Sequence, residues 1–374
     1  MHLETFQLER RQSLWENRVA YNLTETGIHP FRLRELLNES ECAELLDLHQ
    51  GYGQTNGSIP LRESISRLYP DCHRDRVLVT NGSIEANFVA IWSLLEPGDE
   101  LVLMLPNYMQ IWGLARSLGV EVKPFYLKES LGWQPDLDEL ARMITPKTKM
   151  IAVCNPNNPT GSVLSQEARE RLVTLADSVG AWLYADEIYR GAELEGPETP
   201  SFFGTYEKAM VCGGLSKAYA LPGLRIGWLV GPQPQIEAAW ACRDYTTIAT
   251  TAVSNYVANL ALEPARRDRI LTRNRRMLVE NLDHLQRWAE AQNGLFRFRP
   301  PSAGGMAFLH YDLAINSTDL VERVKRETST LIVAGDCFGM DHWVRIGIGS
   351  EPDYLLEGLD RFERVLASLK EEVS

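Results

Sequence analysis

Residues 213–228 read GGLSKAYALPGLRIGW and directly follow a short apolar run, residues 209–212, which is typical of a buried strand. Lys217 therefore stands just beyond the carboxyl end of a predicted strand, where α/β sheets hold their ligands. An amine at such a place can form a Schiff base with an aldehyde if its surroundings lower its pKa. Arg225 follows eight residues later and could clamp a phosphate with two hydrogen bonds. Taken alone, Lys217 is more simply a surface lysine.

The chain around this stretch alternates short apolar runs with amphipathic segments. After the apolar run at residues 76–80, the apolar residues Ile84, Phe88 and Ile91 recur at helical spacing. This rhythm predicts an α/β fold with a mostly parallel sheet of seven strands between helices. The predicted strands are residues 76–80, 101–105, 120–126, 150–154, 181–185, 209–212 and 226–230.

Beyond Gly294 the pattern changes to short strands with two helices, which predicts a smaller α+β domain. We expect an N-terminal arm at residues 1–37 that joins this small domain, a large ligand-binding domain at 38–262, and the rest of the small domain at 263–374. No internal repeat or low-complexity linker marks these boundaries.

The composition excludes several classes of function. Of the 374 residues, 44% are hydrophobic and 24% charged, as in an ordinary soluble protein. The net charge of −12 argues against nucleic acid or an anionic membrane surface as a partner. The six cysteines stand far apart with no C-x-x-C pair, which favours reduced thiols in the cytoplasm and predicts no metal site. No signal peptide or membrane-spanning run is visible, so we expect a cytoplasmic protein.

Three further segments place polar groups where a ligand of Lys217 would lie. The turn NPNNPTG, residues 155–161, follows a predicted strand. Asp186 ends another strand within YADEIY, residues 184–189, where a buried carboxylate needs a cationic partner such as a protonated pyridine nitrogen. The turn TNGSI, residues 80–84, opens a helix whose free N–H groups suit a phosphate.

In combination and in this order, the four segments resemble the aspartate-aminotransferase superfamily of pyridoxal-phosphate (PLP) enzymes, fold type I. The resemblance runs from about Tyr52 to Arg345. It implies PLP as cofactor and a small-molecule amino acid as substrate. It also implies that Lys217 binds the cofactor and transfers protons, that Asp186 pairs with the ring nitrogen, and that Tyr189 hydrogen-bonds the ring's 3-oxygen.

The same resemblance implies the remaining contacts. Asn158 would also bind the 3-oxygen, Tyr108 would stack on the ring, and Arg345 would clamp the substrate's α-carboxylate with Asn158 beside it. Tyr52 resembles the tyrosine that reaches a phosphate in the neighbouring subunit, which implies a homodimer with shared active sites. Where many relatives carry Ser or Thr three residues before the lysine, this chain has Gly214, so the phosphate loses a hydroxyl or other groups compensate. The phosphate would be held by Asn81, Gly82, Ser83, Ser216 and Arg225.

The core motifs do not choose among the reactions that PLP supports. Residues 21–30 and 243–247 resemble the capreomycidine synthase-type cyclases, which remove water from a hydroxylated arginine and close its guanidine into a ring. We therefore expect a lyase or cyclase of secondary metabolism that makes a cyclic guanidino amino acid such as enduracididine or capreomycidine, from 4-hydroxyarginine in preference to 3-hydroxyarginine. An ordinary class I/II aminotransferase, which passes the amino group to a 2-oxo acid, is the alternative.

A guanidinium substrate needs carboxylates near the cofactor. The candidates are Glu9 and Glu25 in the N-terminal segment, and Asp244. The alternatives are that Glu25 caps a helix or lies on the surface, and that Asp244 is a structural partner of Arg243.

Overall fold

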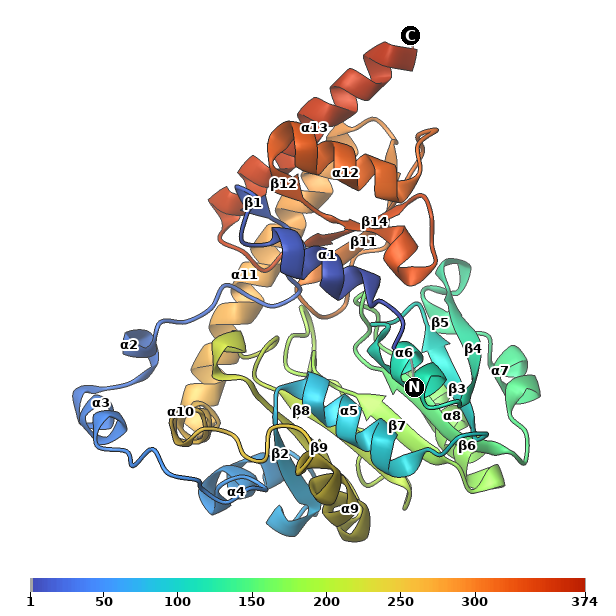
Figure 1. Ribbon diagram of the computed structural model, residues 1–374. Helices are drawn as coiled ribbons and strands as arrows, with labels where there is room; N and C mark the ends of the chain where they lie inside the picture. The colour runs from blue at the N-terminus through green and yellow to red at the C-terminus, as the bar shows by residue number, and fades with distance from the viewer. Residues whose placement is uncertain (1–2, 374) are drawn as a thin grey trace.

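The computed structural model describes residues 3–373, and its main feature is a sheet of eight strands (Figure 1). The strand order is β2-β9-β8-β7-β6-β3-β4-β5, and only β9 and β5 run against the others. The seven predicted strands are present, and the two-residue β5 adds an eighth at the edge. The strands are β2 (Val77–Asn81), β3 (Glu100–Leu105), β4 (Glu121–Lys128), β5 (Gln134–Pro135), β6 (Thr148–Cys154), β7 (Trp182–Asp186), β8 (Ala209–Gly214) and β9 (Ile226–Val230).

Helices cover both faces of this sheet. Leu101 and Leu103 of β3 belong to the hydrophobic core that α5 shares, whereas Val102 and Met104 belong to the core on the other face. Since successive side chains of a strand point to opposite faces, this alternation means that the sheet is buried on both sides. The helices are α4 (Ile59–Ser66), α5 (Ser83–Leu94), α6 (Gln110–Ser117), α7 (Leu137–Met143), α8 (Gln166–Val179), α9 (Gln233–Arg243) and α10 (Ala252–Ala261).

Two smaller sheets form the upper part of the molecule in Figure 1. One is antiparallel with the order β10-β11-β14-β13, and the other is the parallel pair β1–β12. The strands are β1 (Tyr21–Asn22), β10 (Phe296–Arg297), β11 (Met306–Tyr311), β12 (Thr330–Leu331), β13 (Val333–Ala334) and β14 (Trp343–Gly347). The helices beside them are α11 (Pro264–Ala291), α12 (Ser317–Thr328) and α13 (Pro352–Val373).

The N-terminal segment joins this upper part, because β1 pairs with β12. It holds α1 (Gln7–Trp15), and it leads to α2 (Leu33–Leu36) and α3 (Glu39–Leu46). Figure 1 shows α1 lying between the upper part and the large sheet. The division into parts at residues 37 and 262 stays a prediction. Across residues 3–373, every helix is too short or too polar to traverse a lipid bilayer.

Candidate active site

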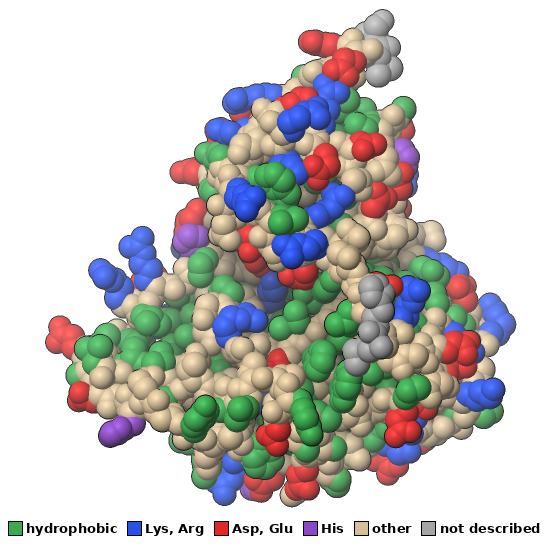
Figure 2. All heavy atoms as spheres, viewed as in Figure 1, with side chains coloured by type: hydrophobic (Ala, Val, Ile, Leu, Met, Phe, Trp, Pro, Cys, Tyr) green, Lys and Arg blue, Asp and Glu red, His purple; other side chains and the backbone are tan. Residues whose placement is uncertain are grey.

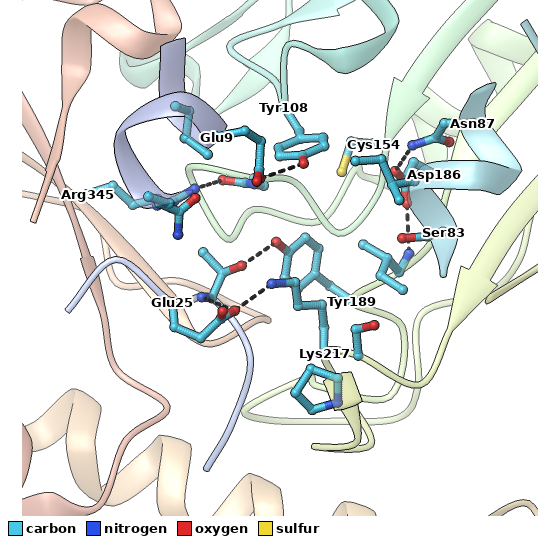
Figure 3. A pocket seen from close by; sticks show the side chains of 18 of the residues that line it. Glu9, Glu25, Ser83, Asn87, Tyr108, Cys154, Asp186, Tyr189, Lys217 and Arg345 are labelled. Carbon is cyan, nitrogen blue, oxygen red and sulfur yellow. Dashed lines mark hydrogen bonds and ion pairs between the residues drawn. The ribbon is translucent and has the colours of Figure 1, made fainter. Parts of the chain in front are cut away.

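A cavity of about 220 Å³ opens where the carboxyl ends of β6, β7 and β8 meet helix α1 (Figure 3). Parallel strands end at one edge of a sheet, so side chains that are distant in sequence converge there. Eleven of the predicted site residues line the cavity: Glu9, Glu25, Ser83, Tyr108, Asn158, Asp186, Tyr189, Ser216, Lys217, Arg225 and Arg345.

Lys217 reaches the cavity from the turn after β8, and its amine is paired. Its Nζ donates a hydrogen bond of 2.6 Å to Oε1 of Glu25. Burial is the largest single influence and lowers the pKa of Lys217, but Glu25 and Tyr189 together raise it by more, so the pKa lies above its ordinary value. The charge of the ammonium lowers the pKa of Glu25 to about 2. The surroundings therefore do not lower the lysine pKa, which was the condition for a reactive amine. Glu25 caps no helix, and its side chain is 52% exposed, as the surface alternative expected, but it is paired with Lys217.

Asp186 ends β7 and is buried. Its Oδ2 accepts a hydrogen bond of 3.0 Å from Nδ2 of Asn87, and its Oδ1 accepts one of 3.1 Å from the backbone N–H of Ile188. Burial raises the pKa of Asp186, and within residues 3–373 no cation forms an ion pair with it. A buried carboxylate without a cation fits the protonated ring nitrogen of PLP. Sequence reasoning missed Asn87, although it stands one helical turn after Ser83 on α5.

The first turn of α5 and the lysine segment converge at another point of the cavity. Gly82 precedes α5 with φ of 80°, and a Cβ there would lie 2.4 Å from Nη2 of Arg225. Nη1 of Arg225 donates a hydrogen bond of 3.5 Å to Oγ of Ser216. The N–H groups of a helix start, a guanidinium and the hydroxyls of Ser83 and Ser216 fit a phosphate. Asn81 precedes this turn and does not line the cavity.

Gly214 is explained by packing. A Cβ at this position would lie 2.9 Å from Cδ1 of Ile188 and 3.0 Å from the carbonyl oxygen of Ile226. A serine or threonine would therefore require the Ile188 side chain to move and the backbone of β9 to give by a few tenths of an ångström. Gly214 lets the backbones of β8 and β9 approach this closely, and the position supplies no hydroxyl to a phosphate.

Tyr189, Asn158 and Arg345 form a further wall of the cavity. The hydroxyls of Tyr189 and Thr26 share a hydrogen bond of 2.8 Å, and burial raises the pKa of Tyr189 to about 12. Arg345, on β14, is 1% exposed and donates from Nη1 to Oδ1 of Asn158 and from Nη2 to the carbonyl oxygen of Thr24, both at 2.8 Å. Its Nε is buried and has no partner among the described residues, and Nη1 and Nη2 each keep a second N–H with which this guanidinium can bind a carboxylate.

Helix α1 lines the cavity with polar side chains from one face. Glu9 and Gln12 stand at positions i and i+3 of α1, and Glu16, which directly follows the helix, stands at i+7. Glu9 accepts a hydrogen bond of 2.6 Å from the hydroxyl of Tyr108. Glu16, which sequence reasoning missed although its spacing from Glu9 could have signalled it, has no side-chain hydrogen bond or ion pair within the described chain. Burial and the charges of Glu25 and Glu9 raise the pKa of Glu16.

Tyr52 and Asp244 lie away from this cavity. Tyr52 is 88% exposed in the loop between α3 and α4. Asp244 is exposed at the end of α9. Its neighbour Arg243 is buried and forms an ion pair with Glu85 of α5, with 3.3 Å between Nε and Oε2. The cavity of a single chain thus has no contribution from Asp244, and Arg243 has a structural partner other than Asp244.

Comparisons with known proteins agree with this geometry. The family model for aminotransferase class I and II matches residues 33–362. Capreomycidine synthase from Streptomyces vinaceus is 30% identical over 356 residues, which cover 94% of this chain and 89% of that protein. A PLP-dependent aminotransferase from Streptococcus suis has 34% identity and a TM-score of 0.93, with 99% of each chain covered. The PLP-dependent cyclase OrfR has 27% identity and a TM-score of 0.89, with 100% of this chain and 98% of that chain covered.

Proposed function

The chain belongs to the class I and II aminotransferase family and is a PLP-dependent enzyme, and we propose that it removes water from a hydroxylated L-arginine and closes the guanidine into a ring. The likeness to capreomycidine synthase and to the cyclase OrfR supports this choice within the family. The products would be cyclic guanidino amino acids of the capreomycidine or enduracididine kind.

The lining residues fit PLP, which when bound draws electrons from the substrate's Cα and makes the Cα proton acidic. Lys217 would hold the cofactor covalently, and Asp186 would face the ring nitrogen. Tyr189 and Asn158 would bind the 3-oxygen, and Tyr108 would contact the ring. The phosphate would lie at the start of α5, held by Gly82, Ser83, Ser216 and Arg225.

One observation carries the proposal: the carboxylate of Glu16 has no partner within residues 3–373 in a wall that also contains Glu9 and Glu25. A guanidinium would relieve the repulsion among these carboxylates and pair with them through its fork of N–H groups. Glu25 uses Oε1 toward Lys217, which leaves Oε2 for the substrate. Arg345 would bind the α-carboxylate with Asn158 beside it.

The protons of the proposed reaction pass through one amine. Nζ of Lys217 takes the Cα proton and, as an ammonium, gives a proton to the departing hydroxyl. The C–O bond breaks, a guanidine nitrogen bonds to the same carbon, and the proton that this nitrogen loses returns to Cα, so one water is released. With the hydroxyl on C4, which we prefer, a Cβ proton must also be removed before the C–O bond breaks, and it is restored after ring closure. The carboxylate wall favours ring closure by holding the nucleophile near the carbon.

A plain aminotransferase is the second candidate. It is favoured by the higher identity to the Streptococcus suis aminotransferase than to OrfR. In that reaction the amino group leaves the substrate and must be passed to a 2-oxo acid, whereas dehydration and ring closure leave it in place.

The two candidates separate in one experiment. The purified holoenzyme is incubated with arginine, 3-hydroxyarginine, 4-hydroxyarginine and uncharged amino acids, each with and without a 2-oxo acid. We expect a hydroxyarginine to lose the mass of one water without any oxo acid. Turnover that requires the oxo acid, with a 2-oxo acid and pyridoxamine phosphate as products, would overturn the proposal in favour of the aminotransferase.

We also propose a homodimer with shared sites. Tyr52 and Tyr245 are 88% and 93% exposed, unusual values for tyrosines without a partner surface. Figure 2 shows hydrophobic side chains gathered on the lower half of the molecule, where α5, α9 and α10 lie. A second chain on this face would bring Tyr52 toward a neighbouring phosphate site, and it is the arrangement in which Asp244 could reach a substrate.

A further inference from the structure

Three consecutive residues of the N-terminal segment each bind a different side chain of the active site. The carbonyl oxygen of Thr24 accepts from Arg345, and the hydroxyl of Thr26 bonds that of Tyr189. Between them, the carboxylate of Glu25 accepts from Nζ of Lys217. Figure 3 shows Glu25 and Tyr189 on either side of the lysine amine.

The carboxylate of Glu25 is fixed by its own loop. Oε1, the atom that binds Lys217, also accepts the backbone N–H groups of Thr26 and Gly27, both at 2.8 Å. Gly27 lies against the lysine segment, since a Cβ there would be 3.0 Å from the carbonyl oxygen of Ser216. A flexible glutamate would have to lose side-chain entropy to keep such a contact, but these backbone bonds hold the carboxylate in place.

Other charged or titratable groups also face Lys217. Glu16 directly follows α1, Asp186 ends β7, and Arg345 comes from β14. The negative charges of Glu16 and Asp186 favour the ammonium and Arg345 disfavours it, as does burial. Tyr189 favours the ammonium where its hydroxyl ionises. Only Glu25 contacts Nζ directly, and with it the pKa of Lys217 is raised rather than lowered.

We propose that Glu25 is a positioning residue that stabilises the ammonium form of Lys217: it holds the amine as an ammonium in the chain without cofactor, and it retains on Nζ the proton that the freed amine takes from the substrate. The assignment goes beyond the proposed function, because every reaction of this family frees the lysine amine when the substrate binds. A freed amine that keeps its proton can return it to the substrate or to a departing hydroxyl instead of losing it to water. Glu25 thereby sets the pH at which Lys217 becomes a nucleophile.

The test measures cofactor attachment rather than turnover. Full-length chain purified without cofactor is mixed with PLP across a range of pH, reduced with borohydride at set times, and the modified Lys217 peptide is quantified. Attachment needs the neutral amine, so its rate rises with pH through the lysine pKa. In Glu25→Gln the amine loses its counter-charge, and we expect the pH profile to move down by at least about one unit, with about tenfold faster attachment at neutral pH.

Two further variants show whether a change in the pH profile comes from the contact between Glu25 and Nζ. Glu16→Gln removes a nearby charge that makes no contact with Nζ, and its profile should move much less. Glu25→Asp keeps the charge but shortens the reach, and its profile should fall between wild type and Glu25→Gln, which also covers the case in which Glu25→Gln does not fold. A pH profile that stays in place in both Glu25 variants, or that moves equally in Glu16→Gln, would overturn the proposal.

Discussion

The active site has two sides, one formed by the strands β7 and β8 and the other by helix α1, and they differ in how deeply their residues are buried. The strands β7 and β8 are buried along almost their whole length, whereas α1 buries only Leu8. Side chains anchored on buried strands cannot shift without disturbing a close-packed core, but the polar face of α1 can change at little cost in stability. Asp186 and Lys217, assigned to the cofactor, belong to the first side, and Glu9 and Glu16, assigned to the guanidinium, belong to the second. In this arrangement the buried strands fix the position of the groups for the PLP chemistry common to the family, and the polar face of α1 selects the substrate.

We expect the largest loss of reaction rate from substitutions on the side formed by β7 and β8, which we call the sheet side. Asp186→Ala should still attach PLP to Lys217 but slow solvent-deuterium exchange at the substrate's Cα by about 100- to 1,000-fold, because nothing would keep the ring nitrogen protonated. Asp186→Asn, which keeps the shape, should be similarly slow. Exchange at the wild-type rate in either variant would show that the core does not fix the chemistry in this way.

We expect a smaller loss of kcat/KM, confined to cationic substrates, from a substitution at the end of α1. Glu16→Gln should lower kcat/KM for substrates with a cationic side chain by about 10- to 100-fold, the value of a hydrogen bond to a charged group. An uncharged amino acid assayed with the same variant serves as the control and should be unaffected. Equal losses for both substrates would mean that α1 supports the site in general, and the contrast between the two sides would fail.

The smallest effect on turnover should accompany a measurable loss of stability. Gly214→Ser should lower the free energy of unfolding by about 1–3 kcal/mol, because its Cβ would overlap Ile188 and the backbone of β9. Urea denaturation measures the change. Gly223→Ser is the matched control, since a Cβ at Gly223 meets no atom within 4 Å. If Gly214→Ser proved as stable as the control, the sheet side would be more adaptable than we argue.

The sequence predicted the sheet side well, and the reason is local. Apolar runs reveal buried strands, and the residue that follows each run must lie at the sheet edge, so Lys217 and Asp186 could be brought together without any long-range information. In the large sheet, only the edge strand β5 was not predicted, because a strand of two residues leaves no periodic pattern in the sequence.

The N-terminal side was harder to predict for the opposite reason. The contact between Glu25 and Lys217 joins residues 192 positions apart and depends on a loop whose course no periodicity encodes. Glu9 and Glu25 were predicted as substrate carboxylates, but their contacts with Tyr108 and Lys217 emerge only from the packing. Those roles, like that of Asp244 and the domain boundaries, stay predictions.

The pairing of β1 with β12 also sets an order of events on the ribosome. Tyr21 pairs with Thr330 and Asn22 with Leu331. The strand β1, which is synthesised first, therefore cannot pair until β12 has been synthesised about three hundred residues later. The large sheet is complete once residue 230 has emerged, and in vectorial synthesis it can fold before the N-terminal segment finds its place. We therefore expect Glu25 to reach Lys217 only near the end of translation, so that a nascent chain cut short before β12 would hold Lys217 without this contact.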